Sequence, residues 1–275
     1  MSGNKTTVTI IGAGIIGGAI AEALTPHFNV IATRRKVHKL NGLEEKGVKV
    51  SQDNRDAARK GDVIILSVKP SQVISVLKEI KEEAKGKVII SFAAAIPTEL
   101  MKKVVSGSKI VRAMTNTAVK VRKGYTLYAH SDDLNDEELS LLCTIFSKLG
   151  EKQRVDEAHM DVLTAMSGSG PAYIFTVVEA MIYGALREGL PRALALQAAA
   201  HTAIGASCLL LESGKHPAEL RDMVLTPGGV TIDGIYELEE SRIRTAFMKA
   251  ISAASSRARV LSEEVRRKAE EEIEE

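Results

Sequence analysis

A glycine-rich hexapeptide near the N-terminus constrains the fold of this chain more than any other sequence feature. Residues 12–17 read G-A-G-I-I-G; they follow a short apolar run and open a helical pattern, Ile15 to Leu24. Gly12 permits a tight turn, Gly14 lets the backbone approach a pyrophosphate, and Gly17 lets the helix lie close to the strand. Amides at a helix N-terminus attract phosphate. The motif predicts a dinucleotide site, and the alternative is an ordinary strand-to-helix turn.

The two halves of the chain predict different secondary structure. In the first half, β-branched runs alternate with helical patterns, which is typical of a parallel sheet covered on both faces. Strands are expected at 8–11, 30–32, 48–50, 63–66, 88–90, 109–111 and 125–129, and helices at 15–24, 71–83 and from a cap at Asn135 to 149. After Val155 the strand signals stop. Helices are expected at 158–166, 171–188, 192–212, 217–223, 229–239 and 241–268.

These patterns predict an α/β fold in which a dinucleotide-binding domain, residues 1–156, precedes an all-helical domain, residues 157–275. Several of the later helices are apolar on more than one face, so we expect a second subunit to cover them. The charged segment Ser262–Glu275 is interpreted as a solvated helix or frayed tail.

Composition excludes several classes of protein. The chain has 275 residues, of which 45% are hydrophobic and 26% charged, which is typical of a globular protein. A net charge of +2 is too small to drive nucleic-acid binding. Cys143 and Cys208 have no metal-ligand spacing, so we expect no metal site and a reducing compartment. Met1–Lys5 lacks a secretory pattern, and the apolar stretch 171–186 is short and contains Glu179. A cytoplasmic protein without membrane contact is predicted.

The end of the second expected strand indicates which dinucleotide binds. An acid at this point would hold a ribose 2′-hydroxyl, as in NAD sites. This chain instead has Thr33-Arg34-Arg35, and arginine pairs with a 2′-phosphate. NADP(H) is therefore the preferred cofactor and NAD(H) a possible one. The alternative is that both arginines face solvent.

Two later strand ends are expected to border the nicotinamide, because ligands lie beyond the carboxyl ends of such strands. One carries Ser67-Val68-Lys69-Pro70 and the other Ser91-Phe92-Ala93-Ala94. We expect Lys69 to contact cofactor and assign it no proton transfer. Asn54, near the third strand, is placed at the adenosine end or in a simple turn.

Two long strings in the helical half are more specific. Residues 166–173 read M-S-G-S-G-P-A-Y, and residues 212–232 read E-S-G-K-H-P-A-E-L-R-D-M-V-L-T-P-G-G-V-T-I. With the glycine motif, residues 67–70 and residues 112–117, they resemble the pyrroline-5-carboxylate reductase family over nearly the whole chain. The resemblance implies a Rossmann domain, a helical homodimerisation domain, and larger rings such as a decamer. It also implies NAD(P)H-dependent reduction of the C=N bond of L-1-pyrroline-5-carboxylate to L-proline.

By this resemblance, the following residues fall on cofactor positions: Ile11, Gly12, Ala13, Gly14, Ile15, Ile16, Asn54, Ser67, Val68, Lys69, Pro70, Phe92, Ala93 and Ala94. The substrate loop comprises Gly228, Gly229, Val230 and Thr231, and the Thr231 hydroxyl is expected to contact the ring nitrogen. The chain departs from the family at Thr115 and Ala118, where prolines are usual, so that loop has less backbone restraint.

The substrate loop also has a physical interpretation of its own. A proline and two glycines before a helix make a turn with exposed amides, which suits a carboxylate; an ordinary helix–helix corner is the alternative. A protonated cyclic imine is already electrophilic, so the site needs orientation more than a proton donor. We expect no catalytic His-Asp pair.

Other interpretations remain. Glu157, His159 and Asp161 suggest either a metal site or a charged helix start. A hydroxyacid dehydrogenase would need a lysine in the helical half, and Val155 to Gly214 contains none. Another NADP-dependent imine oxidoreductase and a non-enzymatic NADP sensor are the remaining alternatives.

Overall fold

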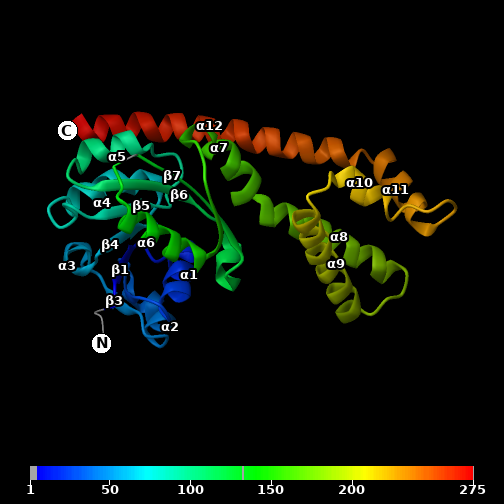
Figure 1. The fold of residues 1–275 in the computed structure, drawn as a ribbon, viewed down its shortest axis with the longest axis horizontal. Helices are drawn as coiled ribbons and strands as arrows, with labels where there is room; N and C mark the ends of the chain where they lie inside the picture. The colour runs from blue at the N-terminus through cyan, green and yellow to red at the C-terminus, as the bar shows by residue number, and fades with distance from the viewer. Residues whose placement is uncertain (1–4, 132, 275) are drawn as a thin grey trace. The chain divides into compact units, whose positions relative to one another are not determined.

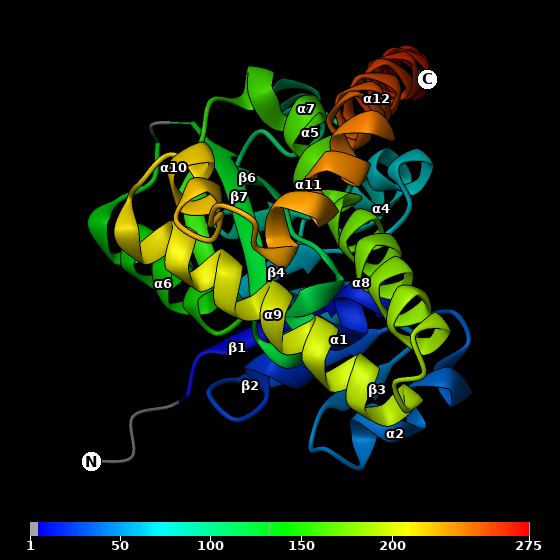
Figure 2. The ribbon, with the colours of Figure 1, turned by 90° about the vertical axis from the view of Figure 1, so that its right-hand side faces the viewer.

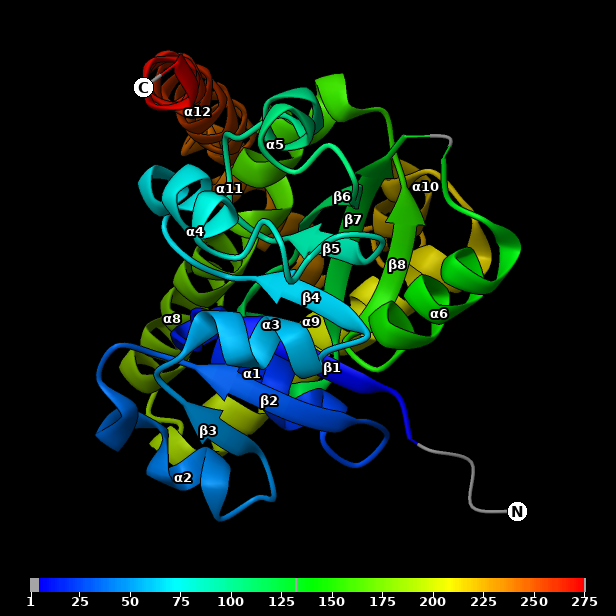
Figure 3. The same ribbon diagram turned by 90° about the vertical axis from the view of Figure 1, so that its left-hand side faces the viewer.

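The β-branched runs of the first half form one eight-stranded sheet, with strand order β3-β2-β1-β4-β5-β6-β7-β8. The computed structural model describes residues 5–131 and 133–274. Residues 1–4, part of the N-terminal segment considered above for a secretory pattern, lie outside these ranges. The strands are β1 Thr7–Ile11, β2 Asn29–Thr33, β3 Lys49–Ser51, β4 Val63–Leu66, β5 Val88–Ser91, β6 Lys109–Met114, β7 Gly124–His130 and β8 Gly150–Arg154. Figure 3 shows them in this order.

The helices α1–α6 connect these strands, and α7–α12 follow them. Their bounds are α1 Ile15–Leu24, α2 Asn41–Glu44, α3 Asn54–Lys60, α4 Val73–Glu79, α5 Thr98–Val104, α6 Asp136–Ser147, α7 Met160–Leu163, α8 Gly170–Arg187, α9 Arg192–Ser213, α10 Pro217–Asp222, α11 Val230–Glu240 and α12 Ile243–Glu274. Short 3₁₀ turns cover Val37–Leu40, Pro70–Gln72, Thr117–Val121 and Glu157–His159, and a π-helical turn covers Thr164–Gly168. The predicted helix 158–166 is thus three short turns.

Alternate side chains of the buried strands point to opposite faces of the sheet. On β4, Val63 and Ile65 join a core beneath α1 and α6, whereas Ile64 and Leu66 join a core beneath α3, α4 and α5. Both faces are therefore apolar, which explains why these strands read as continuous β-branched runs. Asn135 caps α6 through a reciprocal capping box with Glu138, as its position predicted.

The sheet differs from the sequence-based prediction at one edge. β7 pairs antiparallel with β6, so the sheet is not wholly parallel. The adjoining β8 reads Gly-Glu-Lys-Gln-Arg and was not predicted, because its residues alternate between half-buried and exposed at the sheet edge and carry little β-branched signal.

The chain divides into two compact units. The described residues up to Ser169, together with those from Ala254 onward, form the first unit, and Gly170–Ala253 form the second. The predicted boundary between residues 156 and 157 therefore falls inside the first unit. Helix α12 contributes to both units, because its second half belongs with the sheet.

The C-terminal half of α12 is not the solvated end that its charge suggests. Ala269 is buried in the core formed by α4 and α5, and Val265 and Ile273 pack against the same core. The Lys78 ammonium also donates to the Glu272 carbonyl oxygen. Figure 1 shows this half of α12, in red, alongside α4 and α5. The prediction was wrong because one apolar residue per turn suffices to dock a charged helix.

The second unit is all helical, with α8 and α9 packed side by side (Figure 2). Of the α9 residues, only Ala195 and Ala199 are buried within the chain. Among the described residues, α9 is the helix whose length and composition would allow it to cross a membrane. The apolar stretch 171–186, considered above as too short for a membrane span, belongs to α8. Most of the large apolar residues of α9 remain exposed, among them Leu194, Leu196, Ile204, Leu209 and Leu211.

Candidate active site

The glycine turn between β1 and α1 has the geometry that the motif predicts. Gly12 has φ 95°, and its amide and that of Ala13 donate to the Thr33 carbonyl oxygen at 3.1 and 3.0 Å. A Cβ on Gly12 would lie 2.6 Å from Val68, and one on Gly17 would lie 2.5 Å from the Gly12 carbonyl oxygen. A Cβ on Gly14 would meet no described atom within 4 Å. The first and last glycines are thus needed for protein packing, whereas Gly14 borders open space.

The N-terminus of α1 starts at this open position. Gly14 is the N-cap, and within the described residues no side chain caps it. The exposed Ile15 and half-buried Ile16 follow in the first turn. First-turn amides without a protein acceptor carry the partial positive charge of the helix N-terminus, so this end of α1 can receive a phosphate group.

The end of β2 lies directly beside the glycine turn. Thr33 is buried, and Arg34 is half-buried with its guanidinium donating to the Ala13 carbonyl oxygen at 3.3 Å. Arg35 is exposed. The Arg34 side chain therefore does not simply extend into solvent; it is held against the backbone that precedes the open helix end.

Asn54 is connected to this edge by hydrogen bonds. The Thr33 hydroxyl donates to Asn54 Oδ1 at 2.6 Å, and Asn54 Nδ2 donates to Glu79 Oε2 at 3.0 Å. Asn54 is the first residue of α3, whose N-cap is Asp53. Sequence analysis missed Glu79, because it looked for an acid at the end of β2 and this one comes from the end of α4.

The ends of β4 and β5 complete the edge. Ser67 and Val68 are half-buried and adjoin Gly12, and the exposed Lys69 precedes Pro70 at the start of a 3₁₀ turn. After β5, Ala93 is buried and Ala94 exposed. The Phe92 ring stands edge-on to Phe146 at 6.3 Å and thus packs into the core, although its backbone remains at the edge.

The expected substrate loop lies in the second unit. Gly228 has φ 69°, and Gly229 is the N-cap of α11 and donates its amide to the Thr226 carbonyl oxygen at 3.0 Å. A side chain on Gly229 would collide with Thr226. Val230 is exposed and Thr231 half-buried in the first turn of α11. The loop thus presents an uncapped helix N-terminus with a hydroxyl beside it, as its sequence predicts.

The loop at Thr115 and Ala118 is braced without prolines. The Asn116 side chain accepts a hydrogen bond from the Ala118 amide at 3.1 Å and donates to the Ser167 carbonyl oxygen at 3.2 Å. The Thr126 hydroxyl bonds to that of Thr115 at 3.1 Å. A proline at 118 would lack the amide donor, so the Asn116 turn supplies a restraint that this sequence makes possible.

The acidic residues near His159 form ion pairs with an arginine. The buried Arg112 guanidinium lies 3.3 Å from a carboxylate oxygen of Glu157 and 3.3 Å from one of Asp161. Glu157 also accepts hydrogen bonds from the Thr98 amide and hydroxyl. These contacts favour the structural interpretation of the acids over the metal one. Arg112 was missed as their partner because it lies on β6, far away in the sequence.

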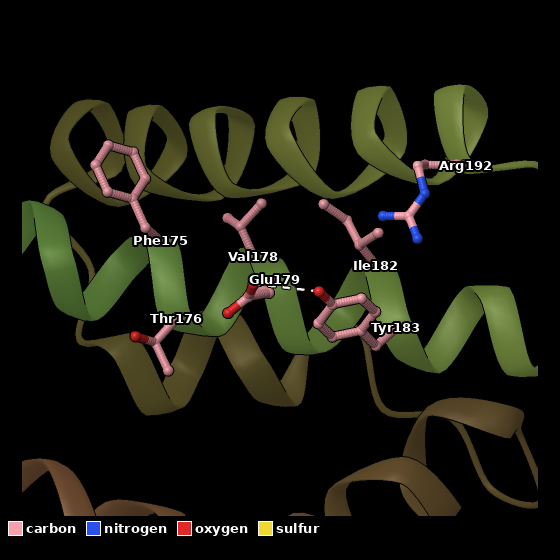
Figure 4. A pocket seen from close by; sticks show the side chains of 7 residues that line it. All are labelled: Phe175, Thr176, Val178, Glu179, Ile182, Tyr183 and Arg192. Atoms are coloured by element: carbon pink, nitrogen blue, oxygen red, sulfur yellow. Dashed lines mark hydrogen bonds between the residues drawn. The ribbon is translucent and has the colours of Figure 1, made fainter.

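A separate hollow of about 350 Å³ lies along α8 in the second unit. Figure 4 shows the Tyr183 hydroxyl hydrogen-bonded to Glu179, with Arg192 nearby. The Arg192 guanidinium lies 6.0 Å from the centre of the Tyr183 ring. None of these residues belongs to the predicted site, and Glu179 accepts its hydrogen bond from a residue of the same helix.

The fold and the site together define a class of protein. A doubly wound sheet with an open glycine turn, joined to a helical unit, is the architecture of a dinucleotide-dependent oxidoreductase. A family model described as pyrroline-5-carboxylate reductase dimerisation matches residues 157–261, and one described as NADP oxidoreductase, coenzyme F420-dependent, matches residues 7–95.

Individual relatives agree with these models. The pyrroline-5-carboxylate reductase of Methanosarcina acetivorans is 41% identical over 92% of this chain and 97% of its own length. The solved structure of the Coxiella burnetii enzyme has a TM-score of 0.82 at 35% identity and covers 94% of this chain and 99% of that one. The Plasmodium falciparum enzyme, solved with NADP bound, has a TM-score of 0.85 at 28% identity, with the same coverage. The chain belongs to the pyrroline-5-carboxylate reductase family.

Proposed function

We propose that this protein reduces the C=N bond of L-1-pyrroline-5-carboxylate to give L-proline, with NADPH preferred over NADH. The observation that carries the proposal is the open N-terminus of α1 at Gly14, beside the Arg34 guanidinium. This position would accept a side chain sterically but has none, which fits the approach of a dinucleotide phosphate. The names of the relatives supply the substrate.

The cofactor-holding residues lie along one edge of the sheet. We assign the pyrophosphate to the amides after Gly14 and the 2′-phosphate to Arg34 with Arg35. The nicotinamide is assigned to the backbone at Ser67–Pro70 and at Phe92–Ala94. Support comes from the contact of Gly12 with Ser67 and Val68, and from the relative solved with NADP.

The substrate carboxylate is assigned to the first-turn amides of α11. Gly228 and Gly229 expose these amides, and no described side chain caps them. Helix α11 runs from Val230 to Glu240 and is long enough for its dipole to favour a negative charge at Gly229. A carboxylate held this way needs no charged side chain at the loop.

The reaction adds one hydride and uses one proton that is already on the substrate nitrogen. When bound, the reduced nicotinamide supplies the hydride to the imine carbon, and the electron pair of the C=N bond passes to nitrogen. The Thr231 hydroxyl is assigned to that nitrogen, where it accepts the N–H hydrogen bond and orients the ring. The side chains therefore orient more than they exchange protons.

A second copy of the chain is proposed to cover α9, which gives a homodimer. Leu209 and Leu211 are 51% and 83% exposed within one chain. The family model that matches this segment is one of dimerisation, which favours a protein partner over a lipid bilayer. A larger ring such as a decamer is proposed as an assembly of these dimers. A cytoplasmic location is proposed because Cys143 and Cys208 are both free and exposed.

The test is a turnover assay on the purified protein with NADPH and pyrroline-5-carboxylate. Loss of NADPH absorbance should match proline formation measured by chromatography, one molecule for one. NADPH oxidation with keto acids in place of the imine would favour the dehydrogenase alternative. Binding of NADPH without oxidation in the presence of any of these compounds would favour the sensor. Light scattering, with and without detergent, tests the proposed dimer.

A further inference from the structure

A carboxylate from α4 reaches the edge of the sheet where the adenosine half of a dinucleotide belongs. Glu79, the last residue of α4, accepts a hydrogen bond at 3.0 Å from Asn54 Nδ2. Asn54 in turn accepts one at 2.6 Å from the Thr33 hydroxyl. The Thr33 carbonyl oxygen accepts the amides of Gly12 and Ala13. Hydrogen bonds to the Thr33 side chain and to its backbone carbonyl therefore connect Glu79 and Asn54, through Thr33, to the glycine turn.

The chemistry of these hydrogen bonds fixes the orientation of the Asn54 amide. A hydroxyl such as that of Thr33 can donate or accept, so it does not by itself decide which end of the amide faces it. An ionised carboxylate only accepts, so Glu79 requires Nδ2 on its side and leaves Oδ1 toward Thr33. Glu79 thus fixes the orientation of the Asn54 amide and, through it, makes the Thr33 hydroxyl a donor.

The orientation of the Asn54 amide matters for cofactor binding because Asn54 lies where the adenosine half of a dinucleotide is expected. In a doubly wound sheet the dinucleotide crosses the carboxyl ends of the strands, with its adenosine half on the β2 and β3 side. Asn54 follows β3 and is bonded to the last residue of β2. One amide hydrogen and one lone pair of Asn54 remain unused by the described contacts. A ribose hydroxyl can use both.

We propose that Glu79 is a positioning residue for the cofactor, which acts through Asn54 by holding its amide ready for the adenosine ribose. This inference rests on the proposed function, because it needs a dinucleotide at this edge. Glu79 is exposed, so its side chain is not required for core packing. The role of the carboxylate is that of an acceptor that cannot donate, which a neutral amide replaces only in part.

The experiment measures the dissociation constant of NADPH, by quenching or enhancement of its fluorescence, for wild type and five variants. Glu79→Ala removes the acceptor and should weaken binding by about three- to tenfold, the effect of one oriented hydrogen bond. Glu79→Gln keeps an acceptor oxygen but also carries an amide donor, so it should bind NADPH more tightly than Glu79→Ala and less tightly than wild type. In turnover assays, Glu79→Ala should raise KM for NADPH by a similar factor and change kcat much less.

Three further variants, Glu82→Ala, Asn54→Ala and the double variant of Asn54→Ala with Glu79→Ala, separate positioning from a general structural effect. Glu82→Ala removes an exposed carboxylate that pairs with Lys85 and should leave the NADPH dissociation constant unchanged. In an Asn54→Ala background, Glu79→Ala should have no additional effect. Equal NADPH binding by wild type, Glu79→Ala and Glu79→Gln would overturn the inference and leave the proposed function intact. If the wild-type protein binds neither NADPH nor NADH, both fall.

Discussion

The carbonyl oxygen of Gly12 lies 2.5 Å from the position that a Cβ on Gly17 would occupy. Helix α1 can lie this close to the turn after β1 because residue 17 has no side chain, and this close approach places the open helix end at Gly14. Replacement of Gly17 by alanine should push α1 away, lower the free energy of unfolding by about 1–3 kcal/mol and weaken NADPH binding at least about tenfold. Denaturant unfolding and NADPH titration measure the two effects.

The neighbouring Gly18 provides the control for that substitution. Its nearest contact would be Leu43 at 3.8 Å, an ordinary van der Waals distance. Gly18→Ala should therefore stabilise α1 by about 0.5–1 kcal/mol, because alanine loses less backbone entropy in a helix. Similar NADPH binding by the Gly17→Ala and Gly18→Ala proteins would contradict the role given to the Gly12–Gly17 contact.

Arg34 is expected to decide between the two dinucleotides. Its guanidinium is held against the Ala13 carbonyl oxygen, where it can pair with a 2′-phosphate that NADH lacks. Arg34→Ala should lower kcat/KM for NADPH by about tenfold and leave that for NADH nearly constant. Arg59→Ala, which removes an exposed arginine at the end of α3, is the control. An unchanged NADPH-to-NADH ratio in Arg34→Ala would refute this assignment.

Thr231 is expected to affect turnover and not cofactor affinity, since it belongs to the second unit and the residues proposed to hold the cofactor belong to the first. Thr231→Ala should reduce kcat by about tenfold or more, as loss of an orienting hydrogen bond predicts. Thr231→Ser keeps the hydroxyl and should retain most activity. The NADPH dissociation constant should stay within about twofold in both. Wild-type turnover by Thr231→Ala would exclude the role.

The packing of α12 can be tested at Ala269. This residue is 3% exposed within the core beneath α4 and α5. Ala269→Asp buries a carboxylate without a partner and should lower the free energy of unfolding by about 2–4 kcal/mol. Arg267→Asp places the same acid on the exposed side of the helix and should cost about 0.5 kcal/mol or less. Equal stabilities would mean that this end of α12 is solvated after all.

The pH dependence of stability should carry a contribution from Glu138. Burial raises the pKa of this carboxyl, but hydrogen bonds from Lys109 and from the Asn135 amide outweigh it, so the pKa lies below 4.5. A carboxyl whose pKa is lower in the folded than in the unfolded state stabilises the fold at pH values above its unfolded-state pKa. This stabilisation is lost as the pH falls through the folded-state pKa. Glu138→Gln should therefore be less stable than wild type near pH 7, by up to about 1 kcal/mol.

The stability difference between Glu138→Gln and wild type should shrink as the pH of the unfolding experiment falls through the lowered pKa of Glu138. Glu137→Gln changes an exposed carboxylate on the same helix turn and should follow the wild-type curve. A Glu138→Gln protein that differs from wild type equally at all pH values would show that the Lys109 ion pair has no part in the pH dependence.

The sequence predicted the β1–α1 turn and the parallel part of the sheet, because these rest on local rules. A glycine-rich turn and a continuous run of β-branched residues can each be identified from a few consecutive residues of the sequence. Residues 228–231 were recognisable in the same way, since a proline, two glycines and a helix start follow one another directly. The whole family assignment came from strings of this kind, and the relatives confirm it.

What the sequence missed are contacts between distant segments. The partner of Glu157 and Asp161 is Arg112 on another strand, and the acid beside Asn54 is Glu79 from another helix. β8 carries no β-branched pattern, and it is a strand only because β7 offers it an edge to pair with. No local propensity encodes such pairings, because their energy comes from groups that meet only after folding.

The amino-acid sequence alone thus determined the class of fold and the family, and it led to the segments that we propose for cofactor and substrate, because those features depend on backbone conformations that glycine, proline and β-branched residues impose locally. The tertiary structure alone decided that the charged end of α12 belongs to the sheet unit, how Asn54 is oriented, and what neutralises the acids beside His159. These features depend on residues that are distant in the sequence and meet only in the folded protein. Because a polar group that loses water without gaining a partner costs free energy, the arrangement in which such groups are paired is favoured.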